Sequence, residues 1–355
     1  MTEERDAFAE RVVSSVAAAM DVFSTYLGEK LGFYRALAEG PLTADALAAQ
    51  AACSERYARE WLEHQAVTGI LRVEGGGGDE ASRRYALPAG HAEVLLDRDS
   101  LSYVGPIVRL FVGAVSALPS LLEAYRTGGG VAYADYGVDL REGQGEINRP
   151  VFLQQLPHEW IPAMPDVHAR LMRAGAKVAD LGCGAAWSAI GIARAYPAAQ
   201  VDAFDLDPAS VALARSNVDK AGLGDRVRVQ LRDAGDAELA GQYDLVAAFE
   251  TIHDMSRPVE ALGAMRRLAA SGGGVMVVDE RVGETFTAPA DELERLMYGW
   301  SILHCLPAGM AEQPSAGTGT VLRPGTLRAY AREAGFADVE TLPLDAGFFN
   351  VYRLV

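Results

Sequence analysis

Short apolar segments alternate with amphipathic helical patterns through the second half of the chain. Helical patterns between consecutive segments predict parallel strands joined by crossovers. The last two segments are joined by a short turn with Pro, Asp and Gly, which only an antiparallel pair allows. The pattern therefore predicts an α/β fold with a seven-stranded, mostly parallel sheet and an antiparallel last strand. The predicted strands are Val178–Leu181, Val201–Asp205, Val227–Leu231, Asp244–Phe249, Gly273–Asp279, Val339–Leu342 and Phe348–Val355.

The first third of the chain has a different pattern. Apolar positions recur at helical spacing over Val12–Tyr34, which predicts one long amphipathic helix. Two shorter helices follow, the first capped by Thr43 and the second covering Glu55–Gln65. Two short extended segments, Ile70–Val73 and Arg84–Leu87, then flank a glycine-rich tip. Two helices followed by a hairpin predict a mainly α N-terminal winged-helix domain.

These patterns divide the chain into three parts. Residues 1–105 hold the N-terminal helical and winged-helix domain, and residues 171–355 hold the sheet. Residues 106–170 begin as an apolar helical connector and continue, after Gly128–Gly130, as a polar and aromatic loop segment. Within the sheet domain, residues 281–322 form an insertion with one apolar helical face and a remainder rich in Pro and Gly, which predicts a lid over a pocket.

The turn after the first strand carries the most specific chemistry. Asp180 and two alternate glycines, Gly182 and Gly184, precede a helical pattern that begins at Trp187. Glycines there let the backbone approach a ligand that a Cβ would exclude, and the helix offers free N–H groups. Asp205 ends the next strand, about 20 residues further on, at the spacing of a carboxylate that binds ribose hydroxyls. The motif therefore predicts a nucleoside-containing ligand at the carboxyl edge of the sheet.

Two of these residues argue against a dinucleotide. Trp187 stands where the third glycine of Gly-x-Gly-x-x-Gly would be. The charge of Asp180 would repel a pyrophosphate. A nicotinamide dehydrogenase is therefore disfavoured, and a ligand with a cationic amine and no phosphate fits better.

The motif resembles the first motif of class I S-adenosylmethionine (SAM) dependent methyltransferases, acid-x-Gly-x-Gly-x-Gly, with Ala186 in place of the third glycine. The resemblance covers roughly the second half of the chain, from Ala174 to Val355. It implies a Rossmann-like methyltransferase sheet with an antiparallel last strand, and SAM as the cofactor.

The resemblance also implies roles for individual residues. It places Asp180, Gly182 and Gly184 beside the methionine portion of SAM, and Asp205 at the ribose. It places Asp233 at the adenine amino group and Ala234 against the adenine ring. Leu206 and Glu250, which follow the second and fourth strands, complete the sheet residues expected to contact SAM. Tyr133 and Tyr136, in the preceding loop segment, are expected to cover the cofactor, because aromatic rings attract a sulfonium.

A base is needed only when the methyl acceptor enters the site protonated. His253, just past the fourth strand, is the predicted base, because an unperturbed histidine pKa of ~6.5 suits proton abstraction at neutral pH. A similar His-Asp pair follows the fourth strand in winged-helix O-methyltransferases, so Asp254 joins the predicted catalytic residues, with a helix-capping role as its alternative. His304, in the predicted lid, is an alternative base.

Charge bears on the role of the winged helix. The chain has a net charge of −16, and the stretch from Gly40 to Ser100 has six arginines, no lysine and ten acidic residues. Nucleic-acid binding needs a basic surface, so neither the whole chain nor this domain favours it. The domain instead resembles the winged-helix dimerisation domain of small-molecule O-methyltransferases, which implies a homodimer formed through the N-terminal domain.

Other features place the protein in a compartment and limit its cofactors. Three scattered cysteines suggest a reducing compartment, and we expect a cytoplasmic protein. No apolar run approaches ~18 residues and no charged leader pattern opens the chain, so no membrane association is expected. No His, Cys, Asp or Glu cluster has metal-ligand spacing, so no metal is expected.

The sequence therefore predicts SAM-dependent methyl transfer to a small-molecule acceptor, most readily an oxygen or nitrogen atom. Three alternatives stay open at this point. The nicotinamide dehydrogenase, disfavoured by Trp187 and Asp180, is joined by two others. One is an enzyme that binds SAM on the same scaffold without transferring methyl. The other is a ligand-sensing winged-helix regulator that binds DNA.

Overall fold

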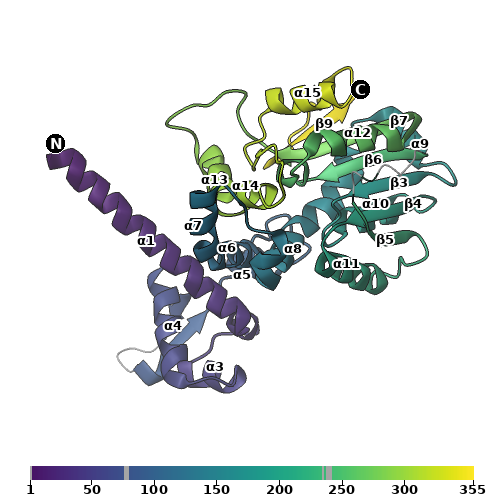
Figure 1. Cartoon of the computed structure of the whole chain (residues 1–355). Coiled ribbons are helices and arrows are strands. Elements are labelled where there is room, and N and C mark those ends of the chain that lie inside the picture. Colours follow the sequence, from purple (N-terminus) through teal and green to yellow (C-terminus); the bar gives the residue numbers. More distant parts are fainter. Residues whose placement is uncertain (1, 76–79, 234–235, 237–241) are drawn as a thin grey trace. The chain divides into compact units, whose positions relative to one another are not determined.

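The computed structural model describes residues 2–75, 80–233, 236 and 242–355 (Figure 1). The chain divides into two compact units, Met1–Val112 and Gly113–Val355. The segment 106–170, expected as a connector, therefore falls largely in the second unit.

The first unit has the predicted winged-helix order, with one difference. Its long helix α1 (Thr2–Lys30) ends before Gly32, which has a left-handed φ of 74° and starts the separate helix α2 (Phe33–Ala38). The prediction of one helix through Tyr34 is wrong at this point, because a left-handed residue breaks the helical hydrogen-bond pattern although the apolar periodicity continues. The remaining elements are α3 (Ala44–Gln50), α4 (Glu55–Val67), α5 (Ala89–Leu96) and the antiparallel pair β1 (Arg72–Glu74) and β2 (Arg84–Ala86).

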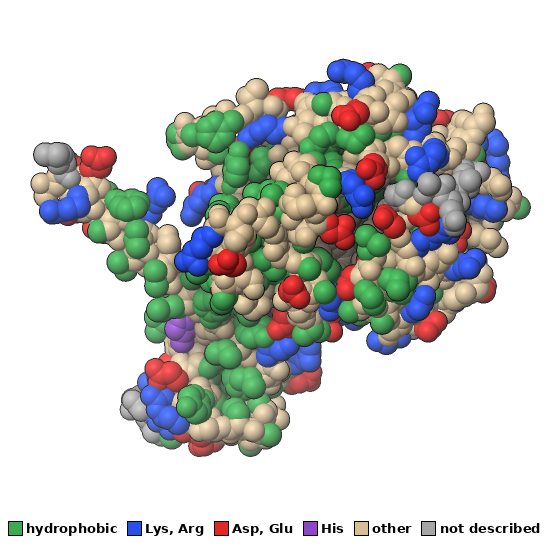
Figure 2. Space-filling view, viewed as in Figure 1, with side chains coloured by type: hydrophobic (Ala, Val, Ile, Leu, Met, Phe, Trp, Pro, Cys, Tyr) green, Lys and Arg blue, Asp and Glu red, His purple; other side chains and the backbone are tan. Residues whose placement is uncertain are grey.

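Aromatic packing holds the C-terminal part of α1 to this unit. Trp61 of α4 packs against the rings of Phe33 and Tyr34, with centroid distances of 4.8 and 5.2 Å, and donates from its indole N–H to the carbonyl of Ser24 at 2.8 Å. Gly28 of α1 lies directly against the indole, where a Cβ would overlap the ring. Further toward its N-terminus α1 keeps large apolar side chains exposed, and Figure 2 shows hydrophobic side chains along this helix.

The second unit is built on the predicted seven-stranded sheet, with strand order β5-β4-β3-β6-β7-β9-β8. All neighbouring pairs are parallel except those of β9, which runs antiparallel to both β7 and β8. The predicted fold class is therefore confirmed. The strands are β3 (Lys177–Leu181), β4 (Gln200–Asp205), β5 (Val227–Leu231), β6 (Tyr243–Phe249), β7 (Ala269–Glu280), β8 (Val339–Thr341) and β9 (Phe349–Leu354).

Helices cover both faces of this sheet (Figure 1). Alternate residues of a strand point to opposite faces, so Val178 joins the hydrophobic cluster on one face and Ala179 the cluster on the other. The first cluster includes α9 (Pro165–Leu171), α10 (Trp187–Ala195) and α11 (Pro208–Lys220). The second includes α12 (Pro258–Leu268) and α15 (Pro324–Glu333). Apolar packing on both faces thus holds the strands in place. The carboxyl ends of the strands lie at the edge of the sheet, where polar side chains can be exposed.

The segment expected to be a loop after Gly128–Gly130 is mostly helical. A short 3-10 turn, η2 (Tyr133–Tyr136), leads into the 19-residue helix α8 (Gly137–Gln155) and a π-helical turn, η3 (Leu156–Trp160). The loop prediction is wrong because three glycines and Pro150 weaken the local helical signal, whereas tertiary packing stabilises the helix. Gly191 of α10 lies directly against the carbonyl of Phe152 in α8, so the two helices pack closely.

The remaining helices of the second unit and its border lie ahead of α8 and between β7 and α15. The expected lid insertion contains α13 (Glu292–Trp300), the π-helical turn η5 (Ser301–Cys305) and α14 (Leu306–Gly309). Among the described residues no single helix is long and apolar enough to cross a membrane. The pair α6 (Ile107–Ser116) and α7 (Leu118–Thr127) meets that test only when taken together, with a bend of 56° between them.

Candidate active site

A cavity of about 600 Å³ lies at the carboxyl edge of the sheet in the second unit. Its lining comes from the turn after β3, the ends of β4 and β6, helix α8 and the lid segment. Parallel strands present their carboxyl ends at one edge, which is where open α/β sheets bind ligands. Ten of the residues selected from the sequence line it: Tyr133, Gly182, Gly184, Asp205, Leu206, Asp233, Glu250, His253, Asp254 and His304.

The glycine turn is held in place by Asp205. The backbone N–H of Gly184 donates to Oδ2 of Asp205 at 2.8 Å, and the N–H of Asp207 donates to Oδ1 at 2.9 Å. Each carboxylate oxygen has a second lone pair, so Asp205 retains acceptor capacity toward the cavity. Gly184 has a left-handed φ of 50°, and the position where its Cβ would stand is open space. The turn therefore presents bare backbone next to a carboxylate that is already oriented.

Asp180 lies beneath the glycine turn, and its predicted place beside the methionine portion of SAM stays a prediction. It is completely buried, lies outside the cavity lining, and accepts a hydrogen bond from the Ser188 hydroxyl at 2.6 Å. Along β3 it shares the sheet face of Val178, so it points beneath the turn toward α10 rather than to the open edge. Burial raises the pKa of Asp180 to about 7. Its position is therefore that of a support for the turn rather than a direct neighbour of the cavity.

Three further residues predicted to contact SAM follow β4 and β5, and the structure describes two of them. Leu206 follows β4 and is 62% exposed at the cavity. Asp233 follows β5 and is exposed where it lines the cavity. Ala234 lies outside the described residues.

Helix α8 contributes a set of cavity residues that the sequence did not indicate. Arg141, Gln144, Gly145 and Asn148 follow one another at helical spacing and form one face of the helix over the cavity. Arg141 pairs with Asp207 at 2.7 Å, and the Gln144 amide donates to the Glu250 carboxylate at 2.9 Å. The 3- and 4-residue spacing of these polar residues is a signal in the sequence that could have indicated this helical face.

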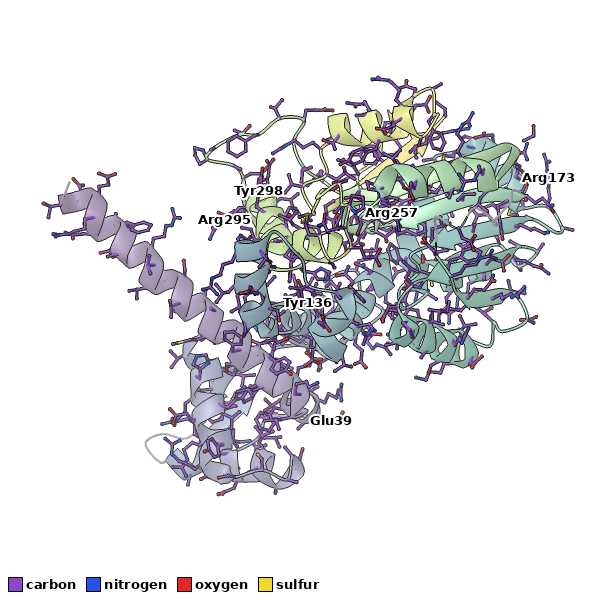
Figure 3. All side chains as sticks on the ribbon, viewed as in Figure 1. Glu39, Tyr136, Arg173, Arg257, Arg295 and Tyr298 are labelled. Carbon is purple, nitrogen blue, oxygen red and sulfur yellow. The ribbon has the colours of Figure 1, made fainter. Side chains whose placement is uncertain are left out.

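The two tyrosines ahead of α8 occupy different places. Tyr133 lines the cavity, with the Arg141 guanidinium 5.9 Å from its ring centre. Tyr136, labelled in Figure 3, is 2% exposed and packs edge-on against the ring of His304 at 4.7 Å, outside the cavity lining. Tyr136 therefore contacts His304 directly, and its predicted contact with the cofactor stays a prediction.

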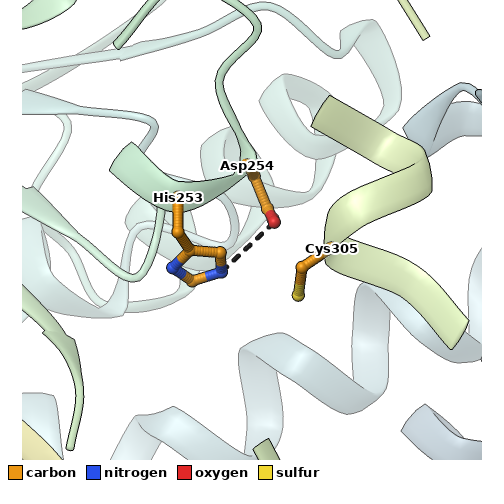
Figure 4. Close-up of side chains that lie close together, drawn as sticks. All are labelled: His253, Asp254 and Cys305. Carbon is orange, nitrogen blue, oxygen red and sulfur yellow. Dashed lines mark ion pairs between the residues drawn. The ribbon is translucent and has the colours of Figure 1, made fainter. Parts of the chain in front are cut away.

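Five ionisable side chains gather where β6 and β7 end, and we call them the His253 cluster: Glu250, His253, Asp254, Asp279 and Glu280. Nδ1 of His253 lies 2.9 Å from Oδ1 of Asp279 and 3.1 Å from Oε2 of Glu280. Nε2 lies 3.2 Å from Oδ1 of Asp254, the ion pair drawn in Figure 4. Strand pairing between β6 and β7 brings these residues together, although Asp279 lies 26 positions beyond His253 in the chain.

The cluster shifts the protonation of its members. Burial by itself would lower the pKa of His253, but the charges of Asp279, Glu280 and Asp254 raise it well above its usual value. Burial and mutual repulsion raise the pKa of Glu250 to about 8, and burial raises that of Glu280 to about 7. The surrounding carboxyl groups therefore favour the protonated form of His253, in contrast to the unperturbed pKa on which its prediction as a base rested.

His304 has the opposite protonation. Burial lowers the pKa of His304, so its ring is neutral at physiological pH. Its Nε2 is buried without a hydrogen-bond partner among the described residues, and the ring lines the cavity. The surroundings therefore favour the protonated form of one histidine of the site and the neutral form of the other.

The fold also gathers donor atoms that are far apart in the sequence. Ring nitrogen of His253, carboxylate oxygen of Asp254 and Sγ of Cys305 lie within 4.8 Å of one another (Figure 4). Burial raises the pKa of the Cys305 thiol to about 12, so this sulfur is a neutral thiol and a weak ligand for a cation. The absence of a metal remains a prediction, but its original argument from spacing along the chain does not hold in three dimensions.

Comparison with protein families matches both units. A model described as a methyltransferase domain matches residues 172–315, and one described as an Rv2258c-like winged HTH domain matches residues 18–97. The ubiquinone biosynthesis O-methyltransferase of Xanthomonas axonopodis pv. citri is 32% identical over 169 residues, which are 48% of this chain and 66% of that protein. The match thus spans slightly less than two thirds of that relative.

Solved structures agree with the fold over nearly the whole chain. The mitomycin 7-O-methyltransferase has a TM-score of 0.71 at 19% identity, covering 100% of this chain and 99% of that one. Human N-acetylserotonin methyltransferase, solved in complex with SAM, has a TM-score of 0.66 at 22% identity, covering 98% and 97%. At these identities the similarity establishes the fold.

Proposed function

The chain joins a methyltransferase domain to an N-terminal winged helix–turn–helix domain, and from this premise we propose that it transfers a methyl group from SAM to a small-molecule acceptor. One observation carries the proposal: the glycine turn, Asp205 and the His253 cluster line a single cavity. The residues that fit a cofactor and the residues that fit a proton acceptor thus line the same cavity, as a transfer reaction requires.

The chain's own residues fit SAM. Gly184 leaves open space where a Cβ would stand, and Asp205 keeps lone pairs free for ribose hydroxyls. Leu206 and Asp233 would flank the adenine, and Tyr133 with Glu250 would lie toward the sulfur. When bound, SAM supplies the methyl group and the sulfur leaving group. The protein therefore has to position the acceptor, exclude water and manage one proton.

We assign proton transfer to His253. The carboxyl groups of Asp279 and Glu280 contact Nδ1 of His253. Nε2 is therefore the ring nitrogen that we expect to exchange a proton with the acceptor. Asp254, 3.2 Å from Nε2, would orient the imidazolium that results. His304, neutral and with a free Nε2, lines the same cavity and is the residue we assign to orienting the acceptor hydroxyl or amine.

The acidic lining limits the acceptor. Asp254 lines the cavity, and the neighbouring His253 lowers the pKa of its carboxyl, so an acceptor with an anionic group beside its reacting atom would be repelled. Phe152, Met255 and several alanines supply apolar lining. A neutral hydroxyl or amine on an apolar framework therefore fits best, and the names of the relatives above support methylation of oxygen.

We further propose that the N-terminal unit joins two subunits rather than binding DNA. On α4, Arg56 pairs with Glu60 and Arg59 with Glu55, so these arginines are neutralised within their own helix. Exposed apolar residues on α1, including Val16 and Met20, form a surface suited to another copy of the helix. The three cysteines are free thiols, which supports a reducing, cytoplasmic setting.

Calorimetry tests the function. S-Adenosylhomocysteine should bind the full chain and, at about 100 times its dissociation constant, stabilise the fold by ~3 kcal/mol. NADH should give no heat. Binding of NADH without binding of either sulfur ligand would show that the sheet edge is a dinucleotide site. Binding of SAM with no methyl transfer across a panel of phenols and amines would favour a SAM-binding protein of another activity.

A further inference from the structure

The His253 cluster carries more negative charge than positive. One imidazole stands among four carboxyl groups, burial raises the pKa of both Glu250 and Glu280, and the charge of Glu280 raises that of Glu250 further. Every residue of the cluster except Asp279 lines the cavity. A buried, uncompensated acidic cluster either keeps protons or acquires a cation.

Other charged groups near His253 do not cancel this excess. The groups that act on the ring electrostatically come from each neighbouring element: Glu250 from the end of β6, Asp254 from its own turn, Asp279 and Glu280 from β7, and His304 and Cys305 from η5. His304 and Cys305 are neutral near pH 7, because burial lowers the pKa of the imidazole and raises that of the thiol. The cluster is therefore compensated by protons in the free protein.

We propose that the His253 cluster exchanges about one proton for the positive charge of SAM, so that SAM binds with proton release and S-adenosylhomocysteine binds without it. The inference rests on the proposed function. It assigns to Glu280 and Asp254 the role of positioning residues that distinguish the charged cofactor from its neutral product.

This exchange prepares the chemical step. The released proton is drawn from the His253–Glu280 pair, and in the tautomer that keeps the Nδ1 proton toward Asp279 the Nε2 atom has a lone pair. In the transfer, the acceptor oxygen forms a bond to the methyl carbon, the carbon–sulfur bond breaks with its electron pair left on sulfur, and the acceptor proton moves to Nε2. The sulfur loses its positive charge as the imidazole gains one, so the charge of the cavity is the same before and after. After the transfer, the cluster therefore holds the same number of protons as in the free protein. When the product has left, the next SAM molecule binds with release of that extra proton.

Calorimetry of the wild-type chain with three ligands tests the exchange. Titrations near pH 7 in phosphate and in Tris, which differ in ionisation enthalpy, report the protons released. We expect about one for SAM and none for S-adenosylhomocysteine. Sinefungin, in which a protonated amine replaces the methylsulfonium centre, should behave like SAM, because the cation rather than the methyl group drives the release. Between about pH 6 and 7.5 the Kd of SAM should fall about tenfold per pH unit, while that of S-adenosylhomocysteine stays flat.

Two matched variants locate the effect. Glu280→Gln should reduce the proton release on SAM binding and weaken SAM by about tenfold or more, with the Kd of S-adenosylhomocysteine unchanged. Retained binding of that product also shows that the variant is folded. Glu312→Gln, at an exposed cavity residue outside the cluster, should leave the proton count unchanged.

Each result has a defined meaning. Equal proton counts for SAM and S-adenosylhomocysteine, or an unchanged count in Glu280→Gln, would overturn the exchange while leaving the function intact. Failure of both ligands to bind the wild-type chain would instead overturn the proposed function.

Discussion

At the residue scale, the carboxylate of Asp205 has two roles. It accepts backbone hydrogen bonds from Gly184 and Asp207, and it lines the cavity where ribose hydroxyls are expected. Asp205→Asn should weaken S-adenosylhomocysteine by ~1.5–3 kcal/mol, because a charged acceptor becomes neutral and one backbone donor loses its best partner. Isothermal titration measures this directly.

Asp202 provides the matched control for that substitution. It lies on the same strand but bonds Gln230 and the Tyr243 hydroxyl, outside the cavity. Asp202→Asn should leave ligand affinity unchanged. Equal losses in both variants would mean that Asp205 acts through the stability of β4 and not through the ligand.

His253 is expected to affect rate more than binding. His253→Ala should lower kcat by ~10²–10⁴-fold, the usual contribution of a general base. The Kd of S-adenosylhomocysteine should change little, because the product needs no proton exchange. His168→Ala is the control, since this histidine bonds the Tyr196 hydroxyl away from the cavity. Full kcat in the His253 variant at neutral pH would transfer the base role to another group such as His304.

Glu250 is expected to make stability depend on pH. Its pKa is about 8 in the folded protein, against an ordinary value of 4.5, so the folded state holds the proton more tightly than the unfolded state. The folded state is therefore destabilised as pH rises from about 4.5 to 8. Gln at this position does not titrate and keeps an oxygen for the Gln144 amide. The stability advantage of Glu250→Gln over the wild type should grow between about pH 5 and 8 and then level off, reaching on the order of a few kcal/mol. Melting temperatures measured across this pH range report it.

An exposed glutamate checks this interpretation. Glu260 lines the rim of the cavity with most of its side chain in solvent. Glu260→Gln should shift the melting temperature by the same small amount at every pH tested. A pH-independent difference for Glu250→Gln would show that Glu250 is not protonated in the folded protein.

Helix α8 controls the cavity at the scale of elements. A Cβ on Gly145 would stand 2.7 Å from the Cβ of Ala185 in the glycine turn, so this helix can approach the turn only because residue 145 lacks a side chain. Gly145→Ala should push the helix from the turn, reduce affinity for S-adenosylhomocysteine and cost ~1–3 kcal/mol of stability. Thermal unfolding and titration calorimetry report the two effects.

A substitution at a second helical glycine distinguishes the effect of packing from that of helix propensity. Gly299 of α13 has open space where its Cβ would stand. Gly299→Ala should leave affinity unchanged and stabilise the chain by up to ~1 kcal/mol, because alanine is the better helix former. Loss of affinity in this control would point to a general effect of the added methyl group on the helices around the cavity.

At the scale of the whole molecule, the apolar face of α1 bears on subunit assembly. Val12, Val16, Met20, Phe23 and Leu27 share one side of the helix and remain 40–59% exposed. If this face joins two subunits, Val16→Glu/Met20→Glu should yield a monomer, because two buried charges would oppose the contact. Ser14→Glu/Ala18→Glu puts the same charges on the opposite side and should leave the dimer intact. Light scattering distinguishes the outcomes, and a monomeric wild-type chain would refute the dimer.

Arg257, labelled in Figure 3, illustrates how charge is distributed around the cavity. It pairs with Glu260 at 3.8 Å and with Glu312 at 4.0 Å, and all three are largely exposed. The rim is therefore electrically balanced and solvated, whereas the interior around His253 is acidic and desolvated. Selectivity for a cationic cofactor is thus concentrated in the interior.

Local patterns in the sequence determined the strands, their order of occurrence and the glycine turn. Period-two and helical spacing are properties of near neighbours, so Gly182, Gly184 and Asp205 were recognisable before any fold was known. His253 was recognisable too, because it follows a strand that had already been identified. The antiparallel last strand followed from the short turn ahead of it.

Tertiary structure alone decided the surroundings of these residues. Asp279 and Glu280 meet His253 only through pairing of β6 with β7, and their charges raise the pKa of the histidine. Helix α8 forms despite Pro150 because its face packs on the turn and on α10. Spacing along the chain does not encode these contacts, since burial and the charges of distant residues determine a pKa, and packing outweighs weak helix propensity.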